Sequence, residues 1–272
     1  HVTGRRDDGY HLLDSLIVFA DLGDQVRVQT ADDLILQIEG PFAGGLPTRD
    51  DNLVMRAAKA IAAAEQGHSR GATITLEKNL PIASGIGGGS ADAAAALKAL
   101  RDLWSLPINA AAMAAMAVLL GADVPVCLSS RTSRVRGIGE NIEVGAPPPP
   151  VGVVLINPGI AVSTVAVFTH RTGEYSAEAD DCGPWSDAAA MVESLRQNRN
   201  DLAEAAIAIA PVIGDVLAAL ETDPACLLAR LSGSGATCFG LFPDDVAAVR
   251  AARDISAAHP DWWVRATRFK DF

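Results

Sequence analysis

A run of glycines in the first third of the chain is the clearest candidate for chemistry. Residues 81–97 read PIASGIGGGSADAAAAL, a glycine-rich stretch followed by an alanine-rich segment typical of a helix. Glycine leaves backbone amides unshielded, and amides at the start of a helix, together with the helix dipole, attract an anion. We therefore predict a phosphate-binding loop formed by Gly85, Gly87, Gly88, Gly89 and Ser90.

Two familiar nucleotide-binding motifs do not fit this run. A Walker A loop needs a lysine directly after its glycines, and none follows here. The dinucleotide fingerprint needs a third glycine where this chain has Ser90. A turn that needs glycine only for close packing is the remaining alternative, and the density of glycines favours phosphate binding over it.

Two further places combine turn signals with polar or aromatic side chains. Asp123 follows Gly121 in LGADVP, so it suits either a turn residue before Pro125 or a general base. Tyr10 and His11 follow the turn signal RRDDG. They suit either the start of a strand or the recognition of a nucleobase by stacking and hydrogen bonds. From the residues alone, both pairs of alternatives stay open.

A second glycine-rich turn, LSGSGATCFG, occupies residues 231–240 between an expected helix and an expected strand. Its Gly233, Ser234 and Gly235 can form either a tight connection or a second binding loop. A helix is expected to begin near Asp51 and Asn52, and either residue suits its N-cap. Asn52 also suits a contact to a ligand.

Charge and composition limit the class of protein. The net charge of −11 at pH 7 would repel a nucleic-acid backbone. Prolines interrupt the long uncharged stretches 103–122 and 144–170, so no membrane-spanning helix is expected. The four cysteines form no C-x-x-C pair, which indicates reduced thiols, a cytoplasmic location and no zinc site. We therefore expect a folded soluble protein that binds neither nucleic acid nor a membrane.

The pattern of apolar residues predicts a mixed α/β chain. Strands are expected at residues 26–29, 34–38, 71–79, 151–156, 237–242 and 262–267. Helices are expected at residues 51–66, 91–104, 110–120, 187–196, 201–208 and 246–258. The run of four prolines at 147–150 marks a change of composition, so we expect two domains, residues 1–150 and 151–272.

The glycine run resembles the central motif of the GHMP kinases, P-x-x-x-G-[LI]-G-G-G-S-[SA]-D-A-A. Further segments resemble, in the same order along the chain, one branch of that family: GRRDDGYHLLDSL, DNLVMRAA, LGADVPV, GIGENI, NPGIAVSTVAVF, NDL and LSGSGATCFG. The resemblance covers essentially the whole chain. It implies an N-terminal α/β domain like ribosomal protein S5 domain 2, a ferredoxin-like C-terminal α+β domain, and an active site in the cleft between them.

Members of that branch transfer a phosphoryl group from ATP to the 2-hydroxyl of 4-diphosphocytidyl-2-C-methyl-D-erythritol, in the non-mevalonate (MEP) pathway of isoprenoid biosynthesis. The resemblance therefore implies an ATP-dependent small-molecule kinase that uses Mg²⁺. A homoserine or mevalonate kinase of the same family and a catalytically idle nucleotide-binding regulator are the alternatives. The segment DGYH, which suits a cytosine pocket, favours the first interpretation. We expect a monomer or a weak homodimer.

The resemblance also implies roles for individual residues. Asp123 is the expected catalytic base. ATP and its phosphates are expected to contact Asn52, Pro81, Gly85, Gly87, Gly88, Gly89 and Ser90. The cytidine substrate is expected to contact Tyr10, His11, Thr164, Phe168, Gly233, Ser234 and Gly235. Magnesium is expected to be held through the phosphates without a direct protein ligand, with Ser90 as one candidate contact, and Asp92 is expected to be an ordinary helix-start residue.

In the family, a lysine in a strand of P-A-K-x-N-L type assists the catalytic aspartate. This sequence begins at HVTGRR, just downstream of the place where that strand would lie. We therefore expect the strand and its lysine to lie upstream of His1.

Overall fold

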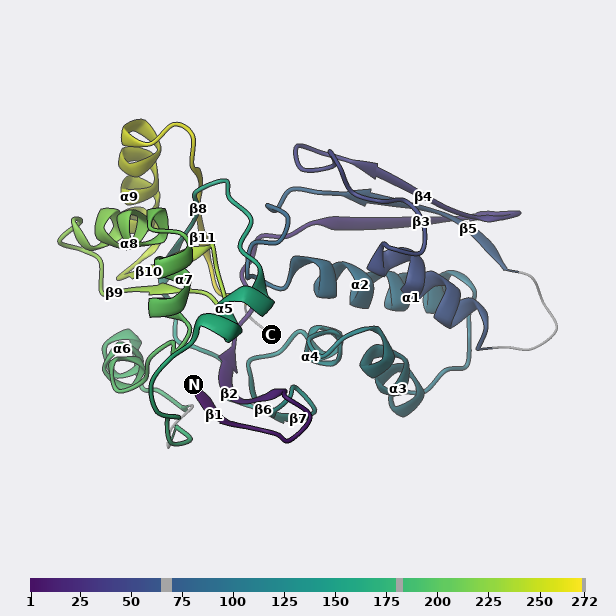
Figure 1. Ribbon diagram of the computed structural model, residues 1–272. Helices are drawn as coiled ribbons and strands as arrows, with labels where there is room; N and C mark the ends of the chain where they lie inside the picture. The colour runs from purple at the N-terminus through teal and green to yellow at the C-terminus, as the bar shows by residue number, and fades with distance from the viewer. Residues whose placement is uncertain (65–69, 180–182, 271–272) are drawn as a thin grey trace. The chain divides into compact units, whose positions relative to one another are not determined.

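The computed structural model describes residues 1–64, 70–179 and 183–270, and its chain divides into two compact units (Figure 1). Unit 1 contains His1–Leu22, Ala83–Ile86 and Arg131–Phe272, and unit 2 contains Gly23–Ile82 and Gly87–Ser130. Each unit is therefore built from segments that are distant in sequence. The domain boundary expected near residue 150 does not coincide with the division into these two units. It stays a prediction.

Unit 2 is a three-stranded sheet with helices packed on it. Its strands lie in the order β3-β5-β4, with β3 antiparallel and β4 parallel to β5. A parallel pair requires a crossover connection, and the first helix of the unit lies in that connection. The elements of unit 2 are β3 (Gln25–Ala31), β4 (Leu34–Glu39), α1 (Leu53–Ala62), β5 (Gly71–Glu77), α2 (Gly88–Leu103), α3 (Ala110–Leu120) and α4 (Val124–Ser129).

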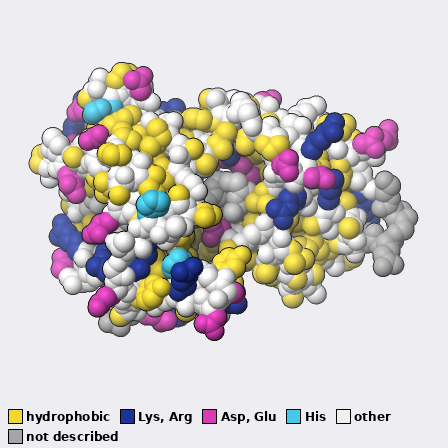
Figure 2. Space-filling model, in the orientation of Figure 1, with side chains coloured by type: hydrophobic (Ala, Val, Ile, Leu, Met, Phe, Trp, Pro, Cys, Tyr) yellow, Lys and Arg dark blue, Asp and Glu magenta, His cyan; other side chains and the backbone are white. Residues whose placement is uncertain are grey.

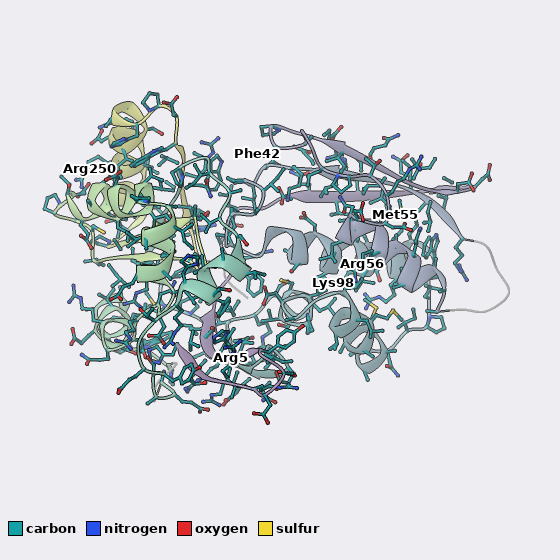
Figure 3. All side chains as sticks on the ribbon, viewed as in Figure 1. Arg5, Phe42, Met55, Arg56, Lys98 and Arg250 are labelled. Atoms are coloured by element: carbon teal, nitrogen blue, oxygen red, sulfur yellow. The ribbon has the colours of Figure 1, made fainter. Side chains whose placement is uncertain are left out.

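Helix α2 is the central packing element of unit 2, because it contacts α1, α4 and β3. Its buried face is rich in alanine and includes Ala93, Ala94, Ala96, Leu97 and Leu100. Small side chains at a helix contact allow the two helix axes to approach closely. The facing helix α1 buries larger residues, among them Met55, which Figure 3 labels. This packing determines where the glycine-rich N-terminus of α2 lies in the unit.

Unit 1 contains two antiparallel four-stranded sheets. The strand orders are β1-β2-β6-β7 and β11-β8-β10-β9. The first sheet consists of β1 (Val2–Arg5), β2 (His11–Ile17), β6 (Ser133–Gly137) and β7 (Asn141–Val144). The second consists of β8 (Gly152–Asn157), β9 (Leu228–Leu231), β10 (Cys238–Phe242) and β11 (Trp263–Arg268). The helices of unit 1 are α5 (Thr164–His170), α6 (Ala188–Arg196), α7 (Ala203–Ile209), α8 (Val212–Glu221) and α9 (Asp245–Ala258).

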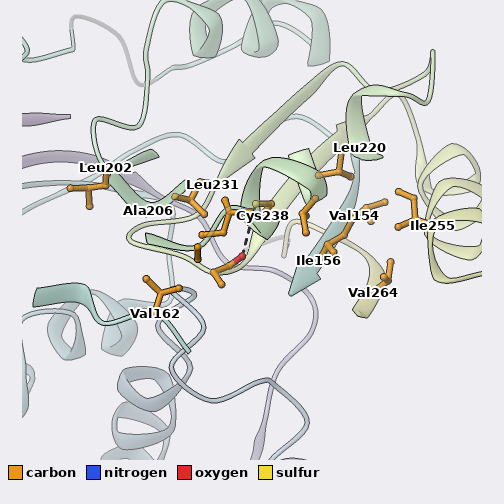
Figure 4. Close-up of a cluster of buried hydrophobic side chains, with 14 of the residues drawn as sticks. Val154, Ile156, Val162, Leu202, Ala206, Leu220, Leu231, Cys238, Ile255 and Val264 are labelled. Atoms are coloured by element: carbon orange, nitrogen blue, oxygen red, sulfur yellow. Dashed lines mark hydrogen bonds between the residues drawn. The ribbon is translucent and has the colours of Figure 1, made fainter. Parts of the chain in front are cut away.

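The second sheet of unit 1 has a hydrophobic core on each face. Along β8, Val154 and Ile156 join a large core with residues of α7, α8 and α9. Figure 4 shows these two side chains in the same cluster as Leu220 and Ile255. The alternate residue Val153 instead joins Met191 and others from α6 in a smaller core. Successive residues of a strand point to opposite faces, so the uninterrupted apolar run of β8 serves both cores.

The strand order of the second sheet confirms the ferredoxin-like expectation for the C-terminal part. In chain order β8 is the first strand and β11 the fourth, so the order β11-β8-β10-β9 is 4-1-3-2. Helix α9 connects β10 to β11 and packs on the sheet. The hairpin partner β9 pairs with β10 in antiparallel register, with Cys238 opposite Leu231.

Several predicted ends are corrected by the structure. The helix expected from Ala91 already begins at Gly88, because glycine can adopt helical backbone angles although it does not favour them. The helix expected over residues 51–66 is shorter, and the residues from 65 to 69 lie outside the described residues. Helix α8 was not predicted at all, because Gly214 interrupts its apolar pattern near the start.

None of the helices within residues 1–64, 70–179 and 183–270 is long and apolar enough to cross a membrane. On the face shown in Figure 2, basic and acidic side chains are interspersed over the coloured surface.

Candidate active site

The glycine run lies across the division between the two units: Gly85 belongs to unit 1, and Gly87 begins the next segment of unit 2. Gly87 is the N-cap of α2 and has a left-handed backbone, φ 70°, with no side-chain capping bond. The first amides of a helix have no partner inside the helix. The amides of the first turn, at Gly88, Gly89 and Ser90, are therefore available to an outside acceptor.

The space around each glycine shows whether close packing requires a residue without a side chain at that position. A Cβ atom added at Gly87 or Gly89 would meet no other atom within 4 Å. At Gly88 the same atom would lie at ordinary contact distance, 3.6 Å from Asp24 Oδ2 and 3.7 Å from Lys78 Nζ. Close packing therefore does not require glycine at these three positions. Bare backbone that faces open space fits a phosphate group.

A buried charge cluster lies beneath the start of α2. Lys78 Nζ donates to Asp24 Oδ2 at 2.5 Å and to Asp92 Oδ2 at 2.8 Å, and all three side chains are at most 7% exposed. Asp24 Oδ1 also accepts hydrogen bonds from the backbone amides of Asn79 and Leu80. The cluster thus ties the segment before β3, the segment after β5 and the second turn of α2 to one another.

The charges in this cluster shift one another's pKa. Burial lowers the pKa of Lys78, but the carboxylates of Asp92 and Asp24 outweigh burial and leave it above its ordinary value. Burial raises the pKa of Asp92 to about 6, although Lys78 opposes that rise. Asp92 was expected to be an ordinary helix-start residue, and the structure instead places it in an ion pair. Lys78 and Asp24 were missed, because no local sequence signal connects residues 54 positions apart.

Asp123 stands at the N-cap position of α4 without making a side-chain capping bond. The residue is accessible to solvent, yet the protein around it partly desolvates its carboxyl group and raises the pKa. Among the described residues, none makes a hydrogen bond or an ion pair with this carboxylate. An accessible carboxylate without a protein partner has the form of a general base, and the catalytic role of Asp123 stays a prediction.

Asn52 and Pro81, the other predicted nucleotide contacts of unit 2, are both buried. Asn52 is the N-cap of α1: its Oδ1 accepts from the amide of Val54, and its Nδ2 donates to Pro47 O, both at 2.9 Å. The structure thus supports the capping role of Asn52, and its contact to a nucleotide stays a prediction.

In unit 1 the structure brings His11 and Phe168 together. Their rings stack with centroids 5.0 Å apart and an angle of 26° between the planes. Burial lowers the pKa of His11, and the positive charges of Arg5 and Arg171 lower it further, so the neutral ring is favoured at pH 7. A neutral imidazole offers one donor and one acceptor nitrogen. The neighbouring Tyr10 is 64% exposed, so its ring is open to a ligand.

The second glycine-rich turn also gathers predicted residues. The hydroxyls of Thr164 and Ser234 lie 2.9 Å apart, in hydrogen-bond contact. Ser232 Oγ donates to the carbonyl of Gly85 at 3.0 Å, so this turn contacts the first residue of the glycine run. Within unit 1 the structure therefore joins three pairs that are distant in sequence: His11 with Phe168, Thr164 with Ser234, and Gly85 with the turn.

A metal site made of protein side chains is not formed by the described residues, since no three or more His, Cys, Asp or Glu side chains come together suitably there. Ser90 lies in the first turn of α2 and its hydroxyl is not a capping group. The expectation that magnesium is held through phosphates stays a prediction.

Comparison with known proteins identifies the family. The chain matches the GHMP kinases N terminal domain over residues 52–131 and the GHMP kinases C terminal domain over residues 180–261. It is 53% identical to the 4-diphosphocytidyl-2-C-methyl-D-erythritol kinase of Cereibacter sphaeroides, over 98% of this chain and 94% of that protein. It is 49% identical to the kinase of the same name of Paramagnetospirillum magneticum, over 97% of this chain and 92% of that protein.

Solved structures agree with these relatives. The crystal structure of a 4-(cytidine 5'-diphospho)-2C-methyl-D-erythritol kinase superposes with a TM-score of 0.80 and 32% identity, over 100% of this chain and 95% of that one. A homoserine kinase from Cytophaga hutchinsonii, 18% identical over 95% of this chain and 88% of that one, has a TM-score of 0.69 and shares the fold. The chain belongs to the GHMP kinase family and, within it, to the branch of the 4-diphosphocytidyl-2-C-methyl-D-erythritol kinases.

Proposed function

We propose that this protein is an ATP-dependent kinase that phosphorylates the 2-hydroxyl of 4-diphosphocytidyl-2-C-methyl-D-erythritol, giving the 2-phosphate and ADP in the MEP pathway. The observation that carries this proposal is the 53% identity over 98% of the chain to a kinase of that name. The homoserine kinase is only 18% identical, so its similarity supports the fold and not its substrate.

The nucleotide phosphates are proposed to bind at the first turn of α2. The amides of Gly88, Gly89 and Ser90 point to the free end of the helix, where the helix dipole favours negative charge. Mg²⁺ bound with ATP would neutralise charge on the transferred phosphoryl group. The chain's own contribution is to hold that end of α2 in place, and the cluster of Lys78, Asp24 and Asp92 supports it from below.

Asp123 is proposed to accept or orient the proton of the acceptor hydroxyl. Its carboxylate is accessible and has no hydrogen-bond partner among the described residues, so no protein bond has to break before it can act. Burial raises its pKa, which makes it a stronger base than an ordinary aspartate.

The cytosine group is proposed to bind beside Tyr10, His11 and Phe168. The stacked pair of His11 and Phe168 supplies a flat apolar face, and the neutral imidazole supplies a donor and an acceptor for the edge of a base. The exposed ring of Tyr10 adds a second stacking surface. The hydroxyls of Thr164 and Ser234 are proposed to contact the diphosphate or the sugar-alcohol part.

A cytoplasmic location is also part of the proposal. The described cysteines, Cys127, Cys226 and Cys238, are free thiols, which suits a reducing compartment. A kinase that consumes ATP would find its cosubstrate there.

The test is an ADP-release assay with the purified protein and three acceptors: 4-diphosphocytidyl-2-C-methyl-D-erythritol, mevalonate and homoserine. We expect turnover with the first acceptor only. The variant D123N keeps the shape of the side chain but cannot act as a base, so kcat should fall at least about a hundredfold with little change in KM.

The matched control for this test is D102N, the same change at an exposed aspartate at the far end of α2. It should retain the kcat of the unmodified protein. Turnover of mevalonate or homoserine at a comparable rate would contradict the proposed substrate. Near-native kcat in D123N would reduce Asp123 to a turn residue.

A further inference from the structure

Asn200 lies in the NDL segment between α6 and α7, and its side-chain amide forms hydrogen bonds with backbone groups. Its Nδ2 donates to the carbonyls of Leu231 and Gly233, at 3.0 and 2.7 Å, and its Oδ1 accepts from the amide of Leu202 at 2.9 Å. Leu231 directly precedes, and Gly233 lies in, the second glycine-rich turn, Ser232–Gly235, the serine-glycine turn. One amide side chain therefore holds the N-terminal side of that turn from outside.

The serine-glycine turn needs such support because its backbone is unusual. Gly233 and Gly235 have left-handed backbones, φ 54° and 89°. Inside the turn, the amide of Gly235 donates to Ser232 O and the amide of Ser232 donates to Thr237 O, both at 2.9 Å. The carbonyls of Leu231 and Gly233 have their side-chain donor in Asn200. A backbone acceptor left without a partner costs free energy, so loss of Asn200 should loosen the turn.

The serine-glycine turn is also locked to the first residue of the glycine run. Ser232 Oγ donates to Gly85 O, and the amide of Thr237 donates to Ser84 O, each at 3.0 Å. A Cβ atom at Gly85 would lie 2.5 Å from Gly235 O and 2.7 Å from Ser232 O, which is closer than real Cβ atoms come. The serine-glycine turn and the start of the glycine run, about 150 residues apart in sequence, thus pack with their backbones in direct contact.

We propose that Asn200 is a positioning residue that fixes the serine-glycine turn and, through the contacts of that turn with Ser84 and Gly85, the start of the glycine run. The proposal rests on the proposed kinase function, in which the serine-glycine turn serves the cytidine substrate and the glycine run serves ATP. Reacting groups have to be held to within a fraction of an ångström, which a loosened turn cannot do until ligand orders it. A chain lacking the Asn200 donors would therefore spend substrate binding energy on ordering the turn.

The sharpest variant is N200D. Its carboxylate still accepts from the amide of Leu202, which preserves the start of α7, but it cannot donate to Leu231 O and Gly233 O. The matched control is N198D, because Asn198 is also partly buried and its Nδ2 donates only to Ser194 O, within the α6 segment. Both variants add one negative charge in a residue adjacent to Arg199, so the net charge of the two proteins is the same.

Hydrogen exchange measured by mass spectrometry on peptides covering residues 231–237 tests the lock without any substrate. We expect N200D to exchange about tenfold faster than the unmodified protein there, and N198D to match the unmodified protein. Equal exchange in all three proteins would overturn the proposal. This readout needs no activity, so it separates failure of the lock from failure of the proposed kinase function.

Kinetics test the consequence for the reaction. For N200D we expect KM for the cytidine substrate to rise about five- to tenfold, with kcat changed less than threefold. A merely destabilised fold would instead lower kcat at unchanged KM, because fewer molecules would be active. That result, or equal KM in N200D and N198D, would overturn the positioning role.

A milder second variant guards against loss of folding in N200D. S232A removes only the hydroxyl that bonds Gly85 O, so the turn loses its side-chain link to the glycine run. We expect KM for ATP to rise about threefold while KM for the cytidine substrate stays within twofold. An unchanged KM for ATP would contradict the coupling of the two loops.

Discussion

Glycines of a single motif have two different physical reasons in this molecule. Gly85 is required by packing, since a Cβ atom there would lie 2.5 Å from the carbonyl of Gly235. Gly87 and Gly89 face open space, with no atom within 4 Å of an added Cβ, although the left-handed backbone of Gly87, φ 70°, itself favours glycine. The glycines of one motif therefore serve two separate purposes. Part of the motif anchors one loop against another, and part of it leaves helix amides uncovered for a ligand.

The largest effect that this comparison predicts is loss of stability in G85A. The added methyl group would clash with two backbone oxygens, Gly235 O and Ser232 O, and the backbone at Gly85 has φ 74°, which disfavours any other residue. We expect the free energy of unfolding to fall by about 3 kcal/mol or more, because neither oxygen belongs to a flexible side chain. Urea denaturation followed by circular dichroism measures it. A loss below about 1 kcal/mol would show that the two loops can separate cheaply.

The second prediction concerns Gly88, which lies between the two open positions and has only ordinary contacts. In G88V the Cβ atom meets its neighbours at 3.6 to 3.7 Å, an ordinary contact, so the fold should persist. The rest of the valine side chain would cover the amides of the first turn, and we expect the Kd for ATP to rise about tenfold or more by calorimetry. The smaller change G88A is the matched control and should weaken ATP less. An unchanged Kd for ATP in G88V would contradict phosphate binding at the first turn of α2.

The third prediction tests the charge cluster that supports the open glycines. Burial raises the pKa of Asp92 from 3.8 to about 6, so between these pH values the folded protein keeps a proton that the unfolded chain has lost. The contribution of Asp92 to stability therefore falls as pH rises through this window. The groups that face it are Lys78 and Asp24.

The variant D92N lacks this titration. From about pH 4 to pH 6, we expect the unmodified protein to lose on the order of 1 kcal/mol of stability relative to D92N. Urea denaturation at several pH values gives the difference. Parallel pH profiles of the two proteins would mean that Lys78 holds Asp92 ionised throughout the window.

The smallest effect is expected in G89A, at one of the two glycines that face open space. Alanine is a better helix former than glycine, and its methyl group would enter open space, so stability should rise by about 0.5 kcal/mol. The sign is opposite to that of G85A, although the two residues are four positions apart in one motif. A destabilised G89A would erase the distinction between the packed and the open glycines.

Local patterns predicted much of the fold. Helix α3 spans Ala110–Leu120 as its apolar run suggested, and Asp187 caps α6 as a residue at a helix start should. Strand β8 appears where an apolar run follows the four prolines. These elements depend on hydrogen bonds and side-chain preferences within a few residues, which the sequence displays directly.

The site was predictable only in part. Asn52 was recognised as a possible N-cap, and it caps α1. The stacking of His11 on Phe168 could not be derived from periodicity, because the two residues are on a strand and a helix far apart in the chain. Lys78 carried no signal beyond its place after a strand, and its two carboxylate partners come from different segments.

The family, the glycine-rich motif and most of the elements follow from local residue types and their spacing, which can be read along the chain. Which glycines are packed, which are open, and the contact of Asn200 with a turn more than 30 residues away become visible in the folded chain alone. The physical reason is that these properties depend on backbone atoms of distant segments. Backbone carbonyls are present in every residue type, so the identity of a residue does not indicate which distant backbone groups will come into contact.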